Sequence, residues 1–306
     1  MSAIVTVGKA YYKGYNMPLY YSTDNVFDID EDSKERYKII FVQAGSGILI
    51  LNGKRYVILS QQIFCLNETD NYQIESSMGL KTEAIGFHPE IINQSFNFST
   101  VRKKEGELST TEEQDIFWLN PFCRRTNRFT GQLSIGPGSG KRFKNIINLI
   151  KEELEVQRDE HWPCRSRTYL IELLFLIYNT IEISSTVENI TLDKDPGDMK
   201  EVILYLYSNY MKKITLQGLT ELFHINHTTL TREFNKVTGM PVMEYLIALR
   251  MYISSQILRD TLLPIAEVME RVGFNDITHF GRMFKKHYGY SPKEYRQRNC
   301  WMLGEV

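Results

Sequence analysis

The stretch Arg232-Glu-Phe-Asn-Lys-Val-Thr-Gly-Met-Pro-Val-Met-Glu-Tyr245 returns fifty residues later as Arg282-Met-Phe-Lys-Lys-His-Tyr-Gly-Tyr-Ser-Pro-Lys-Glu-Tyr295. Six positions are identical in the two copies, and the alignment needs no gap. The same offset pairs Asn226 with Asp276, and both residue types are favoured at helix N-termini. A repeated module therefore decides the fold of the last third of the chain.

Each copy has the pattern of two helices joined by a turn. Short amphipathic helices are predicted over Leu216–Phe223 and Ile265–Val272. A second helix follows in each copy and ends at a glycine, Gly239 or Gly289, because glycine readily adopts the left-handed conformation that stops a helix. In the second copy, Gly273 is the expected left-handed residue of the turn. Two helices joined by a short turn form the helix-turn-helix unit.

The two faces of each second helix differ in character. Apolar residues spaced four apart are expected to face the core, namely Leu230, Phe234, Phe280 and Phe284. The opposite faces carry the candidate base-reading residues Thr228, Thr231, Arg232, Ile277, Thr278 and Arg282. Arginine can grip guanine with two hydrogen bonds, and threonine or isoleucine can contact a thymine methyl group. The candidate phosphate contacts, one turn farther on, are Lys236, Lys285 and Lys286.

Charge and spacing agree with a nucleic-acid partner for this part of the chain. Residues 1–199 hold 22 basic and 27 acidic side chains, whereas residues 200–306 hold 14 basic and 10 acidic ones. Between the copies, Val242 to Arg259 is expected to form one helix that holds the second helices about 34 Å apart, one turn of B-DNA. The alternative is an all-helical interaction domain with duplicated packing residues.

The residues from Pro264 to Arg296 closely follow the C-terminal signature of the AraC/XylS-type transcription regulators. The chain is similar to that family over about residues 197–298. This resemblance implies sequence-specific binding to double-stranded DNA, a homodimer, RNA polymerase as a further partner and an N-terminal sensing domain.

The chain departs from the family pattern at several positions of the two units. Larger or different residues replace the usual ones at Thr220, His224, Met269, His279 and Gly281. Gly281 lowers the helix propensity of the second reading helix by up to about 1 kcal/mol relative to alanine. The second unit is therefore expected to discriminate bases less than the first.

The N-terminal half has short apolar runs separated by turns, which predicts an antiparallel barrel or sandwich. The runs are Tyr37–Val42, Gly47–Leu51, Tyr56–Leu59, Ile63–Leu66, Tyr72–Glu75 and Leu80–Phe87. Asn52-Gly53 predicts a tight hairpin between two of them.

The segment from Gly45 to Tyr56 is similar to the cupin-like sensing domain common in this family, which implies a small-molecule effector. The region 65–74 contains no histidine and His88 stands alone, so neither a metal site nor a cofactor is expected. The candidate pocket residues are the aromatic side chains Phe41, Tyr56, Phe64 and Tyr72. Each of them fits a filled core at least as well.

A glycine- and proline-rich loop is expected at Gly131–Gly140, followed by two helices. Their apolar stripes are Phe143, Ile146, Ile147, Ile150 and Leu154, and Leu170, Leu173, Leu174, Ile177 and Ile181. The pair can pack on its own barrel or on a second subunit, and the family resemblance implies dimerisation. Asp193–Gly197 is polar and turn-forming, as in a linker.

The predicted fold class is thus α+β and multidomain. It comprises a cupin-like barrel (1–135), a helical pair for dimerisation (141–190), a linker (191–197) and an all-α double helix-turn-helix domain (198–298). Four dispersed cysteines are expected to be reduced, and without a signal sequence or spanning segment we expect the protein in the cytoplasm.

Three functions remain open from the sequence. The favoured one is a DNA-binding regulator, not an enzyme, that is switched by a small molecule in the barrel. The second is a regulator without an effector that a protein partner controls. The third is a cupin-type enzyme with a helical appendage, which the missing ligand histidines make the weakest of the three.

Overall fold

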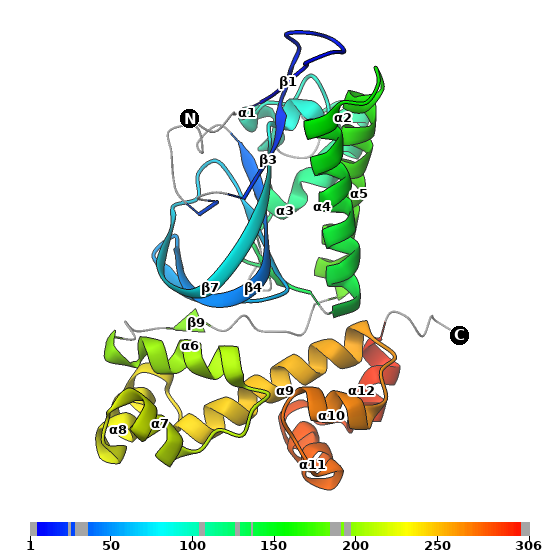
Figure 1. Cartoon of the computed structure of the whole chain (residues 1–306). Coiled ribbons are helices and arrows are strands. Elements are labelled where there is room, and N and C mark those ends of the chain that lie inside the picture. Colours follow the sequence, from blue (N-terminus) through cyan, green and yellow to red (C-terminus); the bar gives the residue numbers. More distant parts are fainter. Residues whose placement is uncertain are drawn as a thin grey trace.

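The apolar runs of the N-terminal half form an antiparallel sheet that closes around its own side chains in the computed structural model (Figure 1). The structure describes residues 5–23, 26–27, 36–103, 108–125, 129–135, 137–183, 191–192 and 197–300. The sheet strands are β3 (Leu19–Ser22), β4 (Tyr37–Leu51), β5 (Lys54–Leu59), β6 (Gln62–Leu66), β7 (Tyr72–Phe87), β8 (Gln132–Ser134) and β9 (Thr191–Leu192). Their order is β3-β7-β4-β5-β9, and β6 pairs with both β4 and β8. A separate hairpin pairs β1 (Thr6–Val7) with β2 (Asn16–Met17).

Two strand breaks expected from the sequence do not occur. Tyr37–Val42 and Gly47–Leu51 are parts of one strand, β4, and Tyr72–Glu75 and Leu80–Phe87 are parts of β7. The two strands pair along most of their length, and the register shifts near the middle of β4. There Gly45 has a φ of +84°, and a Cβ on it would lie 2.3 Å from the Gly79 carbonyl oxygen. The glycines therefore let the strands bend and stay paired, whereas the sequence pattern indicated turns.

The tight hairpin expected at Asn52-Gly53 is confirmed. Asn52 and Gly53 have φ values of 50° and 78°, the left-handed geometry of the turn type that suits twisted strands, and Leu51 pairs with Lys54.

The prediction of a loop over Gly131–Gly140 is wrong in part. Gln132–Ser134 forms β8, which pairs with β6, and helix α4 already begins at Pro137. Three residues on a sheet edge are too short to show alternation, so only the tertiary pairing defines this strand.

Two long helices cover one side of the sheet, α4 (Pro137–Val156) and α5 (Trp162–Ile183). Their predicted apolar stripes are confirmed, because all five residues of the first stripe and the first four of the second are buried against the sheet. Shorter helical elements close this side, namely η2 (Pro89–Ile91), α1 (Phe98–Val101), α2 (Thr110–Ile116), η3 (Phe117–Leu119) and α3 (Asn120–Cys123). None of the helices in the described ranges is both long and apolar enough to cross a membrane.

The C-terminal domain is entirely helical. Its elements are η4 (Gly197–Met199), α6 (Lys200–Asn209), α7 (Leu216–Phe223), α8 (His227–Thr238), α9 (Val242–Asp260), α10 (Ile265–Arg271), α11 (Ile277–Tyr288) and α12 (Pro292–Asn299). We call α7 with α8 the first unit and α10 with α11 the second unit. Each unit has its own apolar core, and α9 contributes residues to both cores. Of the predicted linker, residues 193–196 lie outside the described residues.

The helix α9 also touches the barrel, which the sequence did not indicate. Ile48 and Val57, on the outer face of the sheet, belong to the core of the first unit. Tyr252 Oη lies 2.7 Å from Ser134 Oγ of β8. Arg259 donates to the carbonyl oxygen of the same serine at 3.3 Å. The barrel and the helical domain are therefore packed together through both α6 and α9 (Figure 1).

Candidate nucleic-acid interface

The start and end of each second helix are set by the residues that the repeat singled out. Asn226 Oδ1 accepts a hydrogen bond from the Thr229 amide at 2.8 Å, and Asp276 Oδ1 accepts one from the His279 amide at 2.6 Å. Gly239 ends α8 with a left-handed φ of 77°. The predicted caps are confirmed in both units, so α8 and α11 have defined lengths and directions.

The buried faces of the two helices fix which side chains point outward. Leu230, Phe234, Phe280 and Phe284 are completely buried, as the four-residue spacing predicted. The opposite faces are therefore turned to solvent. The exposed predicted readers and phosphate contacts are Thr228, Arg232, Ile277, Thr278, Arg282, Lys236, Lys285 and Lys286.

The outward face of α8 carries a shallow depression that is wide open to solvent. This depression, of about 610 Å³, is lined by His227, Thr228, Thr231, Arg232, Asn235 and Lys236. The sequence analysis missed His227 and Asn235. Asn235 follows Thr231 by four residues and Arg232 by three, so helical spacing alone would have placed it on the same face. An asparagine there adds a group that can pair with the N6 and N7 atoms of adenine.

Thr231 differs from the other predicted readers. It lines the depression, yet its Oγ1 is buried and has no hydrogen-bond partner among the described residues. In this conformation its hydroxyl is not offered to solvent.

On the outward side of α8, the acidic residue Glu233 contacts two cations, Arg232 and Lys236. Arg232 Nε donates to Glu233 Oε1 at 2.9 Å, and Lys236 Nζ lies 3.6 Å from Glu233 Oε2. The hydrogen bond from Arg232 and the positive charge of Lys236 lower the pKa of the Glu233 carboxyl. Glu233 is therefore ionised at neutral pH, and its position in the second unit is taken by Met283.

The last turn of α11 is basic. Lys285, Lys286 and His287 follow one another there. Burial and the neighbouring Lys286 lower the pKa of His287, so this imidazole is neutral near pH 7. The positive charge at this end of the helix therefore comes from the two lysines.

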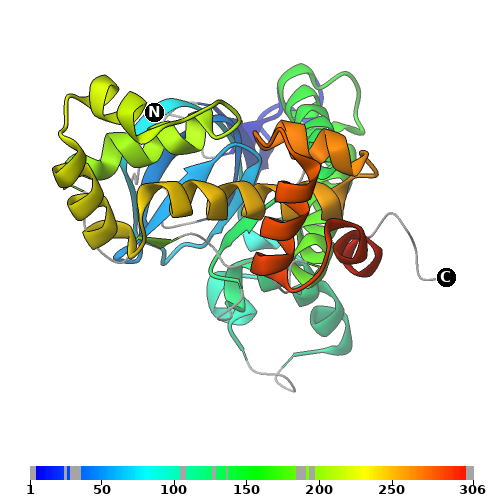
Figure 2. The same ribbon diagram turned by 90° about the horizontal axis from the view of Figure 1, so that it is seen from below.

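The two units lie at opposite ends of α9 (Figure 2). In Figure 1, α8 and α11 are on the side of the helical domain that is turned away from the barrel. The docked barrel therefore leaves both α8 and α11 uncovered.

The predicted pocket residues of the barrel do not all come together. Tyr56, Phe64 and Tyr72 belong to one buried cluster inside the sheet. Phe41 belongs to the cluster on the other face, against the helices, because alternate residues of β4 point to opposite sides. Within the described ranges, no three or more histidine, cysteine or acidic residues are placed to hold a metal ion.

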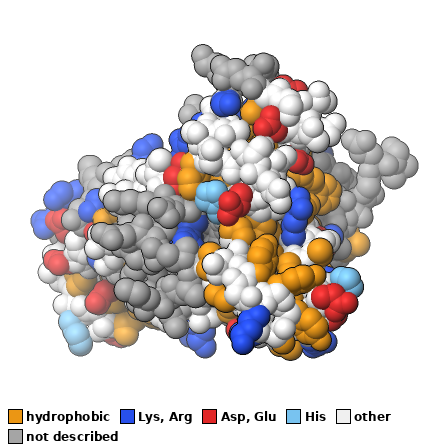
Figure 3. All heavy atoms as spheres, turned by 90° about the horizontal axis from the view of Figure 1, so that it is seen from above, with side chains coloured by type: hydrophobic (Ala, Val, Ile, Leu, Met, Phe, Trp, Pro, Cys, Tyr) orange, Lys and Arg blue, Asp and Glu red, His pale blue; other side chains and the backbone are white. Residues whose placement is uncertain are grey.

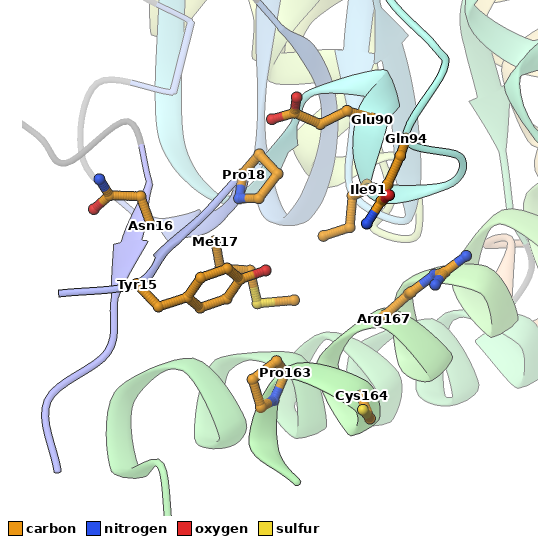
Figure 4. A pocket seen from close by; sticks show the side chains of 10 residues that line it. All are labelled: Tyr15, Asn16, Met17, Pro18, Glu90, Ile91, Gln94, Pro163, Cys164 and Arg167. Atoms are coloured by element: carbon orange, nitrogen blue, oxygen red, sulfur yellow. The ribbon is translucent and has the colours of Figure 1, made fainter. Parts of the chain in front are cut away.

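A second depression, of about 450 Å³, lies between the segment Tyr15–Pro18, η2 and the start of α5 (Figure 4). Met17 and Ile91 form its apolar floor, and Glu90 and Arg167 reach it from different elements. It lies outside the barrel, and most of its lining side chains are exposed.

Exposed apolar side chains gather at the end of the molecule seen in Figure 3. The β1–β2 hairpin contributes several large ones, namely Val7, Tyr11, Tyr12 and Tyr15.

Comparisons with known proteins identify both parts of the chain. Residues 19–117 match the family described as AraC-like ligand binding domain, and residues 219–298 match that described as helix-turn-helix domain. The HTH-type transcriptional activator RhaS of Enterobacter sp. (strain 638) is 22% identical over 270 residues, 87% of each chain. The uncharacterized HTH-type transcriptional regulator YdiP of Escherichia coli (strain K12) is 29% identical over 175 residues, 56% of this chain and 57% of that protein. The solved C-terminal domain of the response regulator yesN from Fusobacterium nucleatum is 35% identical, with a TM-score of 0.31, and the match covers 32% of this chain and 98% of that one.

Proposed function

The chain is a transcription regulator of the AraC type, with an AraC-like ligand-binding domain and a helix-turn-helix domain, and we propose that both of its units dock in successive major grooves of one operator. The observation that carries this proposal is the matched exposure of Arg232 and Arg282 at corresponding positions of α8 and α11. Both helices are anchored on one rod, α9, so their separation is set by the fold.

The two arginines are the proposed guanine readers, and the neighbouring side chains complete the contacts. Thr228 in α8, and Ile277 and Thr278 in α11, face the same groove as the arginine of their own helix, whereas Thr231 lines this face with its hydroxyl buried. Lys236, Lys285 and Lys286 neutralise phosphates and supply affinity that falls as salt rises. His227 and Asn235 join the first reading face.

Substitution of the arginines tests this proposal. Arg232→Ala and Arg282→Ala are each expected to lower affinity for the promoter region by about 1 to 3 kcal/mol, and to lower affinity for random DNA less, because a base contact is lost. Titrations of both duplexes at fixed salt measure the two losses. Equal losses on the two DNAs would show that the arginines contact phosphate only.

We further propose that a small molecule bound in the barrel switches the protein, with Tyr56, Phe64 and Tyr72 as the pocket residues. The shared location of these three side chains inside the sheet supports this assignment, whereas Phe41 lies on the other face. A thermal-shift screen of metabolites on the full chain distinguishes control by a small molecule from control by a protein partner. A chain that regulates its promoter but responds to none of them favours the partner.

A homodimer through α4 and α5 completes the proposal, together with contact to RNA polymerase and a place in the cytoplasm, where the chromosome lies. Leu149 on α4 and Phe175 on α5 keep about two fifths of their surface exposed, at 39% and 45%, which supports a second copy packing there. No catalytic role is proposed for the barrel.

A further inference from the structure

The two units share an exposed arginine on the outward face of the second helix, but among the described residues only Arg232 is bonded to a carboxylate. Arg232 Nε donates to Glu233 Oε1 at 2.9 Å. Arg282 is followed by Met283, which packs against the core of the second unit and cannot accept such a bond. The difference is at one position of the repeat, so it separates two otherwise similar readers.

The hydrogen bond to Glu233 uses Nε of Arg232, an atom that is not needed for pairing with guanine. A guanidinium has five N–H donors in a planar fork, of which Nε carries one and the two terminal nitrogens carry four. In the described part of the chain, neither terminal nitrogen of Arg232 has a hydrogen-bond partner, and the side chain is 68% exposed. The terminal edge is therefore free to pair with O6 and N7 of guanine while Glu233 keeps Nε.

The carboxylate is itself held from both sides. Its second oxygen lies 3.6 Å from Lys236 Nζ, one turn along the helix, and its own side chain is only 32% exposed at the flank of α8. A planar guanidinium that is already bonded to a carboxylate samples fewer conformations before it binds, and so loses fewer when it does.

We propose that Glu233 is a positioning residue that orients Arg232 for a guanine in the half-site of the first unit, and that the second unit lacks this device. The inference rests on the proposed function, and it assigns to Glu233 a part in the base discrimination of the first unit. The first unit then discriminates its base pair more strongly than the second, because Arg282 must be ordered on binding.

Glu233→Gln tests the proposal because the isosteric amide removes the negative charge and with it the charge-assisted bond to Arg232. We expect affinity for random DNA to rise, because a negative charge beside the phosphates is gone, and the ratio of promoter to random affinity to fall by about two- to fivefold. Titrations of the full-length protein on a promoter duplex and a scrambled duplex of equal length measure both quantities. Glu233→Met, which copies the second unit, should behave in the same way.

Glu221→Gln is the matched control. Glu221 is exposed on α7 in the same unit and bonds to Gln217, so its substitution changes the net charge equally without touching Arg232 or Lys236. This variant should raise affinity for both duplexes by similar factors and leave their ratio unchanged. A purely electrostatic role of Glu233 would give the same result in both variants, and that outcome overturns the proposal.

Two further readouts tie the effect to Arg232. Glu233→Gln and Arg232→Ala should relax discrimination at the same base pair when each pair of the site is exchanged in turn. In an Arg232→Ala background, Glu233→Gln should no longer lower the ratio. A fall of equal size in that background contradicts the positioning role, and a wild-type protein that does not prefer promoter DNA contradicts the proposed function itself.

Discussion

At the scale of single residues, both turns of the repeat contain one left-handed residue, but the residue type and the turn length differ. The left-handed residue is His224 in the first unit, with a φ of 52°, and Gly273 in the second, with a φ of 80°. These two lie 49 residues apart, whereas the caps Asn226 and Asp276 lie 50 apart, so the second turn is one residue longer. The gapless offset of the repeat therefore holds from the caps onward but not across the turn.

Two glycines of the second unit should respond in opposite ways to the same substitution. Gly273→Ala should lower the free energy of unfolding by about 1 to 2 kcal/mol or more, because alanine is strained at this φ and its Cβ would lie 2.7 Å from the Met211 carbonyl oxygen. Gly281 lies in the helix α11, and a Cβ there would have no atom within 4 Å. Gly281→Ala should raise stability by up to about 1 kcal/mol.

Urea unfolding of the full chain, monitored by circular dichroism, measures both changes. The pair controls for the loss of backbone freedom in the unfolded chain, which is the same in the two variants. A stabilised Gly273→Ala variant would mean that this turn is not left-handed.

At the scale of elements, each reading helix is defined by local chemistry at its ends and by burial of one face. Asn226 and Asp276 each satisfy an amide at a helix start that would otherwise lack a partner. Both caps were visible in the sequence because capping depends on residues three apart, a range that the sequence displays directly.

Loss of either cap should destabilise its own unit. Asn226→Ala and Asp276→Ala should each lower the free energy of unfolding by about 0.5 to 2 kcal/mol. Asn235→Ala is the control in α8, because the same chemical change at an exposed interior position of the helix removes no cap and improves helix propensity. Hydrogen exchange of α8 and α11 locates the effect, and equal losses in Asn226→Ala and Asn235→Ala would show that the cap contributes nothing.

At the scale of the whole molecule, α9 is more than a spacer between two units. Polar and charged residues of its last turns are buried, and Arg259 pairs with Asp260 at 2.8 Å where both side chains are only 3% exposed. Such a buried pair requires nearby groups that satisfy it, and the barrel edge supplies one, the Ser134 carbonyl oxygen. The barrel thus completes the environment of the helix that carries both readers.

Disruption of this contact should uncouple the two domains. Ile48→Asp places a charge in the apolar core that the barrel shares with the first unit, so the domains should unfold in separate calorimetric transitions where the wild type shows one. Ile50→Asp is the control, because Ile50 is on the same face of β4 but outside that core. Separate transitions in the wild type would show that the contact is energetically weak.

The sequence by itself determined the parts of this protein that depend on short-range order. The repeat, the caps at Asn226 and Asp276, the buried faces of α8 and α11, the hairpin at Asn52-Gly53 and the stripes of α4 and α5 all follow from spacings of a few residues. Secondary structure periodicity and capping act over that range, so the pattern is readable without the fold.

Only the tertiary structure decided what joins residues that are distant in the chain. It made β4 and β7 continuous, turned three residues of an expected loop into β8, separated Phe41 from the other barrel aromatics and brought Ser134 to Tyr252. It also showed the hydrogen bond between Arg232 and Glu233. Helical spacing does not predict this contact, because side chains of adjacent residues point in different directions. These features depend on pairing partners and side-chain rotamers, which a one-dimensional pattern does not contain.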